Sequence, residues 1–406
     1  MDGFFVTATW LDVLAITACA GCIACAWAAP QSGALRRTLW KGLGGATLLI
    51  TISSLLMLLS RTWEMSGAPL TAVGQFLPLV AMKTHYGTAW WARMAAVLVL
   101  WLAWVAGRFS SGRGPAGALY ALALAVIAYT RSATGHAGDD GMFMPAVWID
   151  WLHLLAGGVW VGSLLAWSLI VFPALLRNDA WQSDAAQRRL AVNGYGRLSA
   201  LSGVAVAVIA LSGAYGAWEG LGTTAALWQS PYGRILLVKV ALVGGMLGLG
   251  AHNRYVKLPH LDQWAGQWGA RHPLVNKLPG FSSWPYCANP EAIDPLQRCA
   301  RTINIQALLG IAVLAVAALL HHAMPPADMH HSFCEPSSIN AAVELISPLQ
   351  GGHSMPHPRQ AIHQHPVGRV HTNKTQPRYS ISMIRKALQS PGQPPDTAAR
   401  GCHSGR

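Results

Sequence analysis

Long apolar runs separated by short polar segments dominate the pattern of the chain. Each run is long enough to cross the roughly 30 Å hydrocarbon core of a bilayer, for which an α-helix needs about 20 residues. Because a segment in lipid must satisfy its own backbone hydrogen bonds, each run predicts a transmembrane α-helix. The eight predicted spans are 5–29, 41–60, 86–107, 115–132, 146–176, 196–219, 232–252 and 302–322.

The start of the chain favours a retained first helix over a cleaved signal peptide. The small residues at Ala26-Trp27-Ala28-Ala29 offer a cleavage point, but the chain begins Met1-Asp2-Gly3. A secretory signal has a positively charged segment in that place. We therefore expect the first span to stay in the membrane.

The positive charges between the spans predict the orientation of the protein. Loops that carry an excess of Lys and Arg remain in the cytoplasm. The odd-numbered connections hold Arg36, Arg37, Lys41, Arg108, Arg113, Arg177, Arg188, Arg189, Arg197, Arg254 and Lys257, whereas the even-numbered ones hold mainly Arg61, Lys83 and Arg131. This bias places both termini in the periplasm of a bacterial inner membrane.

Short motifs recur in the same order in the two halves of the chain. The matching pairs are Trp10-Leu11-Asp12 and Trp148-Ile149-Asp150, Trp63-Glu64 and Trp218-Glu219, Tyr86-Gly87 and Tyr232-Gly233, and His136-Ala137 and His322-Ala323. Four spans preserve orientation, so the pattern predicts a parallel internal repeat. We expect an all-α polytopic membrane protein made of two parallel four-helix modules, residues 1–140 and 141–326.

Two segments fall outside the spans. Residues 253–300 are rich in Trp and Pro, and we expect a cytoplasmic loop with a short interfacial helix around Leu261–Trp268. After Pro325-Pro326 the composition changes to Pro, His, Ser and Gln without apolar periodicity, which predicts a disordered tail over 327–406. The sequence leaves open whether this histidine-containing tail has any function.

Composition agrees with a membrane protein. Hydrophobic residues make up 52% of the 406 residues and charged residues only 11%, against about 25% charged residues in a soluble domain. The net charge of +13 lies mostly in the connections, where it sets orientation, so we expect a lipid membrane and no nucleic acid as partner. No G-x-x-x-x-G-K-[ST] loop is present, and we expect neither ATP-driven transport nor an enzyme.

Four ionisable residues lie inside predicted spans at matching places of the repeat. Asp12 and Arg93 fall about 10 Å below the outer surface, at 1.5 Å of rise per residue. Asp150 and Lys239 occupy the equivalent places in the second module. Because an isolated charge in lipid is costly, we expect two pairs, Asp12 with Arg93 and Asp150 with Lys239. They are either structural clamps or part of an ion path.

His153 lies deep in the fifth span and is not required by the repeat, since its counterpart is Ala15. Asp150, Gly157 and Trp160 share its helix face at i−3, i+4 and i+7. An ionisable residue inside a membrane is by default a candidate functional residue, and Asp150 could orient the imidazole. The alternative is a histidine that only bonds to a neighbouring helix.

A second group of candidate ligands lies at the outer ends of the helices. His136 is followed by Met142 and Met144. Imidazole and thioether together suit copper, methionine favouring Cu(I), so this loop predicts an outer copper site with His153 as the next station about two turns deeper. The other candidates on the same side are Met65, His85 and His322. Copper binding needs neutral imidazole and should weaken on acidification. Methionines in apolar chains are also common packing residues.

Three cysteines, Cys19, Cys22 and Cys25, lie within the first span. Thiolates at this spacing could bind Cu(I). Small buried residues at a helix interface explain them equally well, so metal binding by these cysteines stays open.

The chain resembles the copper resistance D (CopD) family of inner-membrane proteins. The segments that carry the resemblance are Met65-Ser66-Gly67, Thr84-His85-Tyr86-Gly87 with Trp90 and Arg93, Gly135-His136-Ala137, Leu152-His153 with Trp160-Val161-Gly162, Tyr232-Gly233-Arg234 with Lys239, His252-Asn253-Arg254, and the last span from Arg301 to Pro325-Pro326. The resemblance implies copper transport at the inner membrane, uptake into the cytoplasm, and a periplasmic copper-binding partner of the CopC kind. Span 1 lacks a histidine, and the tail beyond about residue 330 falls outside the resemblance.

Two other functions remain open at this point. A membrane b-type cytochrome would need paired histidines deep in facing helices, and only His153 is deep. A docking platform for a periplasmic copper-binding protein would need no conduction. The oxidation state of copper, the direction of flux, a coupling ion and the oligomeric state are not determined by the sequence.

Overall fold

The computed structural model describes residues 2–28, 33–109, 115–139, 141–177, 184–266 and 295–326. Within these ranges the chain is helical and contains no strand, as predicted. The predicted tail over 327–406 and most of the predicted loop lie outside the described residues.

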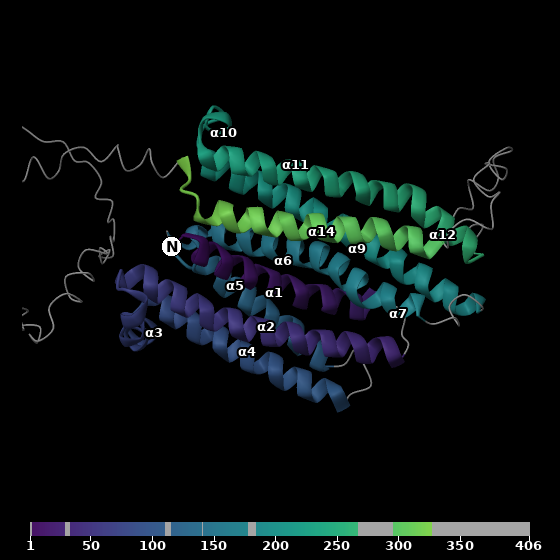
Figure 1. The fold of residues 1–406 in the computed structure, drawn as a ribbon, viewed down its shortest axis with the longest axis horizontal. Coiled ribbons are helices and arrows are strands. Elements are labelled where there is room, and N and C mark those ends of the chain that lie inside the picture. The colour runs from purple at the N-terminus through teal and green to yellow at the C-terminus, as the bar shows by residue number, and fades with distance from the viewer. Residues whose placement is uncertain are drawn as a thin grey trace, which may run out of the picture.

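Eight long helices form the bundle, and each contains a stretch long and apolar enough to cross a membrane (Figure 1). This confirms the predicted number of spans. The helices are α1 (Asp2–Ala28), α2 (Gly33–Ser66), α4 (His85–Phe109), α5 (Pro115–Ala133), α6 (Pro145–Ala166), α9 (Ala185–Leu221), α11 (Pro231–His252) and α14 (Pro295–His322).

Short helical elements mark the two ends of the bundle. The end at which α1 begins, here named the outer end, carries η1 (Leu70–Gln75), α3 (Leu77–Lys83), η2 (His136–Gly138) and α10 (Ala226–Gln229). The opposite end, here named the inner end, carries α7 (Phe172–Leu176) and α12 (Leu258–Trp264).

The seventh span is longer than its hydropathy pattern predicts. After His252 the chain continues through a π-helical segment, η4 (Asn253–Lys257), where a loop was expected, into α12, which overlaps the short helix predicted around Leu261–Trp268. Two contacts explain the continuation: the Asn253 amide donates to Gln306 Oε1 of α14 at 2.9 Å, and Leu261 is buried against neighbouring helices. Polar Arg254 and Lys257 obscure this packing in the sequence. The second π segment, η3 (Trp167–Val171), similarly joins α6 to α7.

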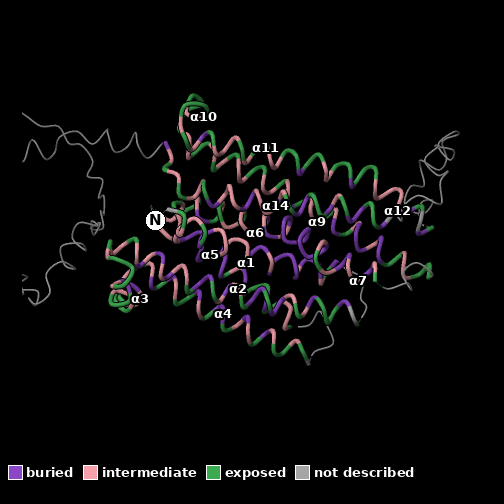
Figure 2. Tube along the Cα trace, in the orientation of Figure 1, coloured by how far each residue is buried: buried purple, intermediate pink, exposed green. Residues whose placement is uncertain are grey.

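The core lies where α1 and α6 cross. Gly21 of α1 and Gly162 of α6 meet backbone to backbone, and a Cβ atom on either would collide with the main chain of the other helix. Figure 2 shows burial concentrated on these central helices. Glycine therefore permits the close approach that organises the bundle.

Helix pairing follows the order of the predicted repeat with one exception. Helix α1 packs on α2 as α6 packs on α9, and α4 packs on α5 as α11 packs on α14. The exception is that α2 and α4 lie along each other, whereas α9 and α11 touch at few points. In an 18-residue window, 44% of α2 and 39% of α4 are buried, against 11% for α9 and 6% for α11. The superposable repeat itself stays a prediction.

Candidate functional site

A buried ion cluster occupies the outer half of the first four helices. Asp12 of α1 is fully buried, and both of its oxygens accept hydrogen bonds from the guanidinium of Arg93 on α4. Ser53 donates to Asp12 at 2.8 Å, and Arg93 Nε donates to Ser54 Oγ at 2.8 Å. Two adjacent serines of α2 therefore hold the pair in one geometry, which is what a buried ion pair needs to offset desolvation.

Arg131 of α5 joins this cluster and was not predicted as a partner. Its Nε lies 3.6 Å from Asp12 Oδ2 and has no hydrogen-bond partner, although the side chain is only 8% exposed. Two guanidinium groups therefore share one carboxylate. The repeat did not reveal it, because the residue that corresponds to Arg131 is Ala317.

The equivalent residues in the second half are arranged differently. Asp150 is exposed and Lys239 is partly buried, and they form no ion pair within 4.0 Å of the kind that Asp12 makes. Both nevertheless lie within electrostatic range of His153. The predicted direct contact of Asp150 with Lys239 is therefore wrong: Asp150 is exposed, and the two side chains form no ion pair.

His153 of α6 lies between its own helix and α9, where its ring contacts Ser212 and Gly213. Its Nδ1 is 2.9 Å from Ser212 Oγ, and a Cβ atom on Gly213 would come within 3.3 Å of the ring. The predicted orienting residue was Asp150, but the ring is hydrogen-bonded to Ser212. The absence of a Cβ at Gly213 leaves room for the imidazole against α9.

The hydrogen bonds of Ser212 indicate which ring nitrogen of neutral His153 carries the proton. The single hydroxyl hydrogen of Ser212 is directed at the Val208 carbonyl, 2.6 Å away. Ser212 Oγ can therefore only accept from the ring, so we assign the proton to Nδ1. Neutral His153 then carries its lone pair on Nε2, the arrangement of metal-binding histidines whose other nitrogen is held by a fixed partner.

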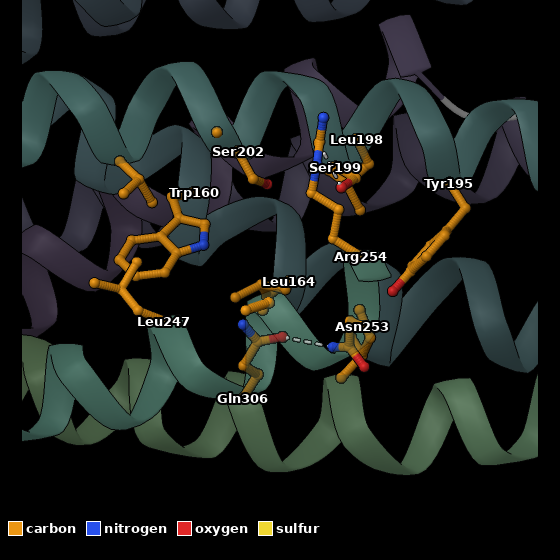
Figure 3. Close-up of a pocket in the computed structure, with 15 residues that line it drawn as sticks. Trp160, Leu164, Tyr195, Leu198, Ser199, Ser202, Leu247, Asn253, Arg254 and Gln306 are labelled. Carbon is orange, nitrogen blue, oxygen red and sulfur yellow. Dashed lines mark hydrogen bonds between the residues drawn. The ribbon is translucent and has the colours of Figure 1, made fainter. Parts of the chain in front are cut away.

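Open space, here named the seam, lies beside α6 at Gly157, inward of His153. Gly157, one turn deeper on the same helix face, has nothing within 4 Å of the position that a Cβ atom would take. Trp160, a further turn deeper, lines a cavity of about 220 Å³ between α6, α9, α11 and α14. Figure 3 shows Trp160 and Leu247 towards one end of this cavity and Tyr195 and Asn253 towards the other.

Polar side chains line the inner part of the cavity. Ser199 accepts a hydrogen bond from Arg254 Nη1 at 3.0 Å, and Asn253 donates to Gln306 (Figure 3). Ser202 also lines it. Ser199, Ser202 and Gln306 were not predicted, because they belong to separate spans. Asn253 and Arg254 carry part of the family resemblance, and the η4 extension of α11 brings them against α9 and α14.

The histidines of the outer end meet, but the Nε2 atoms of two of them, His136 and His322, are already hydrogen-bonded. The rings of His136 and His321 are 5.4 Å apart, as are those of His321 and His322. His136 Nε2 donates to the His321 carbonyl at 3.0 Å, and His322 Nε2 is 2.9 Å from Thr9 Oγ1. A metal would have to displace these bonds. Arg61 and Arg131 lie within electrostatic range of His321 and His322, which disfavours a bound cation.

The other predicted outer ligands are not gathered around His136. Met144 is exposed just before α6, and the Met142 carbonyl accepts from Tyr129 at 2.7 Å. His85 is exposed at the start of α4, and Met65 is partly buried near the end of α2. In the described ranges, no three His, Cys, Asp or Glu side chains are grouped so that they could hold a metal ion.

The three cysteines of α1 lie in the core between helices. Cys19 Sγ is 3.4 Å from the Tyr120 hydroxyl, and Cys25 donates to the Ser163 carbonyl at 3.7 Å. All three are buried and free. Their surroundings are those of packing residues.

Two protein-family models match this chain. The model of the copper resistance protein D family matches residues 192–320, and that of the copper resistance protein D-like N-terminal domain matches residues 1–145. The chain is 34% identical over 225 residues to a copper resistance protein D of Pseudomonas syringae pv. tomato, covering 53% of this chain and 67% of that protein.

A second relative is more distant. The copper transport protein CutJ of Bacillus subtilis (strain 168) is 27% identical over 232 residues, covering 55% of this chain and 41% of that protein. The match therefore spans less than half of the Bacillus protein. No solved structure gave a significant match.

Proposed function

Because the chain belongs to the copper resistance protein D family, we propose that it carries copper across a bacterial inner membrane. In this proposal copper enters from the periplasm, which the outer end faces, and leaves into the cytoplasm at the inner end. The protein is a multi-pass membrane protein with a role in copper handling; the direction, the path and the residues are the proposal.

The observation that carries the proposal is the setting of His153. Its ring is held by Ser212 through Nδ1, which presents Nε2 as a ligand for a soft or borderline metal ion. Gly157 leaves open space directly beneath, and the cavity that begins at Trp160 continues towards the inner end. A ligand, an opening and a polar exit thus follow one another along α6.

Electrostatics favour this route over the first four helices. The cluster of Asp12, Arg93 and Arg131 has two cations for one anion and is closed by hydrogen bonds. Around His153, one ammonium and one carboxylate lie in range, and the carboxylate of Asp150 offsets part of the stronger effect of Lys239. A copper ion near His153 therefore meets less repulsion than one near Arg131.

The outer end would receive copper from a periplasmic donor of the CopC kind. Met144 and His136 are exposed there, and His136 lies beside His321. Transfer would exchange the hydrogen bonds of these histidines for metal bonds, which suits a transient acceptor better than a storage site.

The haem alternative is less well supported. Two axial histidines must face each other across the macrocycle. The other described histidines lie at helix ends, and His153 is the one within the middle of a span. An absorption spectrum of the purified protein tests it. A Soret band together with bound iron would indicate electron transfer instead of copper transport.

Copper uptake into proteoliposomes tests the proposal. We expect His153→Ala to lose uptake, while His252→Ala, an exposed histidine outside the cavity lining, should retain it. Uptake by the His153→Ala protein equal to the parent rate would overturn the route.

A second pair of variants distinguishes a loss of copper passage from a loss of folding. Gly157→Leu should fold, because its surroundings are open, but its side chain should block the seam. Gly45→Leu on α2 is the matched control, since nothing lies within 4 Å of that position either. Equal uptake by the two leucine variants would show that the seam is not the path.

A further inference from the structure

Two arginines face a second cavity at the inner end, on the surface of α9 and the η4 extension. The cavity has a volume of about 760 Å³, within the range of about 300–1,000 Å³ typical of small-molecule sites. Its lining includes Arg197, Ala200, Arg254, Tyr255, Leu258 and Pro259. It therefore combines two cations with apolar walls.

Neither arginine is neutralised by a carboxylate of the described chain. Arg197 and Arg254 are exposed and form no ion pair there, and Arg254 donates instead to the neutral Ser199 hydroxyl. Of the acidic residues at the inner end, Asp184 accepts from the backbone N–H of Ala186 and Asp262 is buried, and neither lines the cavity. The cavity consequently presents uncompensated positive charge.

The position of the cavity identifies its ligand. It lies at the inner end of α9 and α11, the two spans that are least buried within the protein and are therefore surrounded by lipid. Basic pockets between transmembrane helices on the cytoplasmic side bind anionic lipid headgroups. Tyr255 and Leu258 offer the mixed apolar and polar contacts found at the membrane interface.

We propose that Arg197 and Arg254 bind the phosphate of an anionic phospholipid, with its glycerol region against Leu258 and Pro259. Helix α9 supplies one arginine and the η4 segment supplies the other, so the lipid would link two helices that otherwise touch at few points. The site does not depend on copper transport. Free phosphate would share the two arginines but not the apolar contacts.

Native mass spectrometry of the full chain in detergent tests the site, with phosphatidylglycerol and phosphatidylcholine added separately. We expect tighter binding of phosphatidylglycerol, and about fivefold weaker binding in each of Arg197→Gln and Arg254→Gln, since one basic residue contributes about 1 kcal/mol to an anionic membrane. Arg108→Gln is the matched control, because Arg108 is an exposed arginine at the inner end of α4 that stacks on Trp104.

A third variant tests the shape of the cavity without changing its charge. Ala200→Trp should fill the cavity and reduce phosphatidylglycerol binding while both arginines remain. The proposal is overturned if phosphatidylcholine binds as tightly as phosphatidylglycerol, or if the glutamine and tryptophan variants bind like the parent protein. Displacement of the lipid by millimolar inorganic phosphate would also overturn it, since the ligand would then be the free anion.

Discussion

In the first half of the bundle Asp12 and Arg93 are buried and bonded to each other, whereas in the second half Asp150 is exposed and makes no ion pair with Lys239. The difference begins in the partner helix. Ser53 and Ser54 of α2 support the first pair, and the corresponding residues of α9 are Val208 and Ile209. Equivalent charges thus form a closed clamp in one half and remain loosely placed in the other.

The second half has a histidine at a position where the first half has a buried alanine that packs in the core. His153 corresponds to Ala15, which is fully buried, and its partner Ser212 corresponds to Met57. Helices α9 and α11 touch at few points, and the cavity opens between them, α6 and α14, inward of the seam at Gly157. We infer that the first half stabilises the bundle and that the second half carries the functional opening.

The largest expected effect is the loss of the closed clamp. Arg93→Gln removes the two hydrogen bonds from the guanidinium and leaves buried Asp12 with Ser53 and the more distant Arg131, so it should destabilise the protein by about 3–5 kcal/mol. Lys239→Gln should cost about 1 kcal/mol or less, because no ion pair is lost. Thermal unfolding of both variants in detergent measures the contrast. Equal losses would show that the second pair is also a clamp.

The next effect sharpens the role of His153. Ser212→Ala removes the group that fixes the imidazole, and loss of such a supporting partner typically weakens metal affinity by about 10–100-fold. Copper binding to purified protein should fall by that factor while the unfolding temperature changes little. Ser60→Ala, at a buried serine of α2 outside the cavity lining, is the control. If copper affinity is unchanged in Ser212→Ala, Nε2 of His153 is not a copper ligand.

Hydropathy predicted the fold well because each span is a local property of the sequence. The eight spans follow from runs of apolar residues, and the contact of Asp12 with Arg93 agrees with their equal depth. The π-helical continuation at Asn253 was not predictable in this way, since it depends on Gln306, which is 53 residues away.

The site was less predictable, because it too depends on contacts between residues that are far apart in the chain. The sequence located His153 as a deep histidine, but it offered Asp150 as the orienting group because both lie on one helix. Ser212 comes from another helix, 59 residues along the chain, and no periodicity connects them. The predicted outer ligands shared only a membrane side, which does not bring Met65 or His85 to His136.

The smallest expected effect concerns the unmatched arginine of the clamp. Arg131 is buried, and its Nε has no hydrogen-bond partner. The carboxylate of Asp12, which it faces, already accepts two hydrogen bonds from Arg93. A buried charge with an incomplete set of partners contributes little net stability, because desolvation offsets its attraction to Asp12. Arg131→Met keeps the length and apolar stem of the side chain, so the free energy of unfolding should change by about 1 kcal/mol or less, in either direction. Measured beside Arg93→Gln under the same conditions, it distinguishes a two-residue clamp from a three-residue one. A loss for Arg131→Met as large as that for Arg93→Gln would show that Arg131 is an essential member, and that the first half holds its charges as a triad.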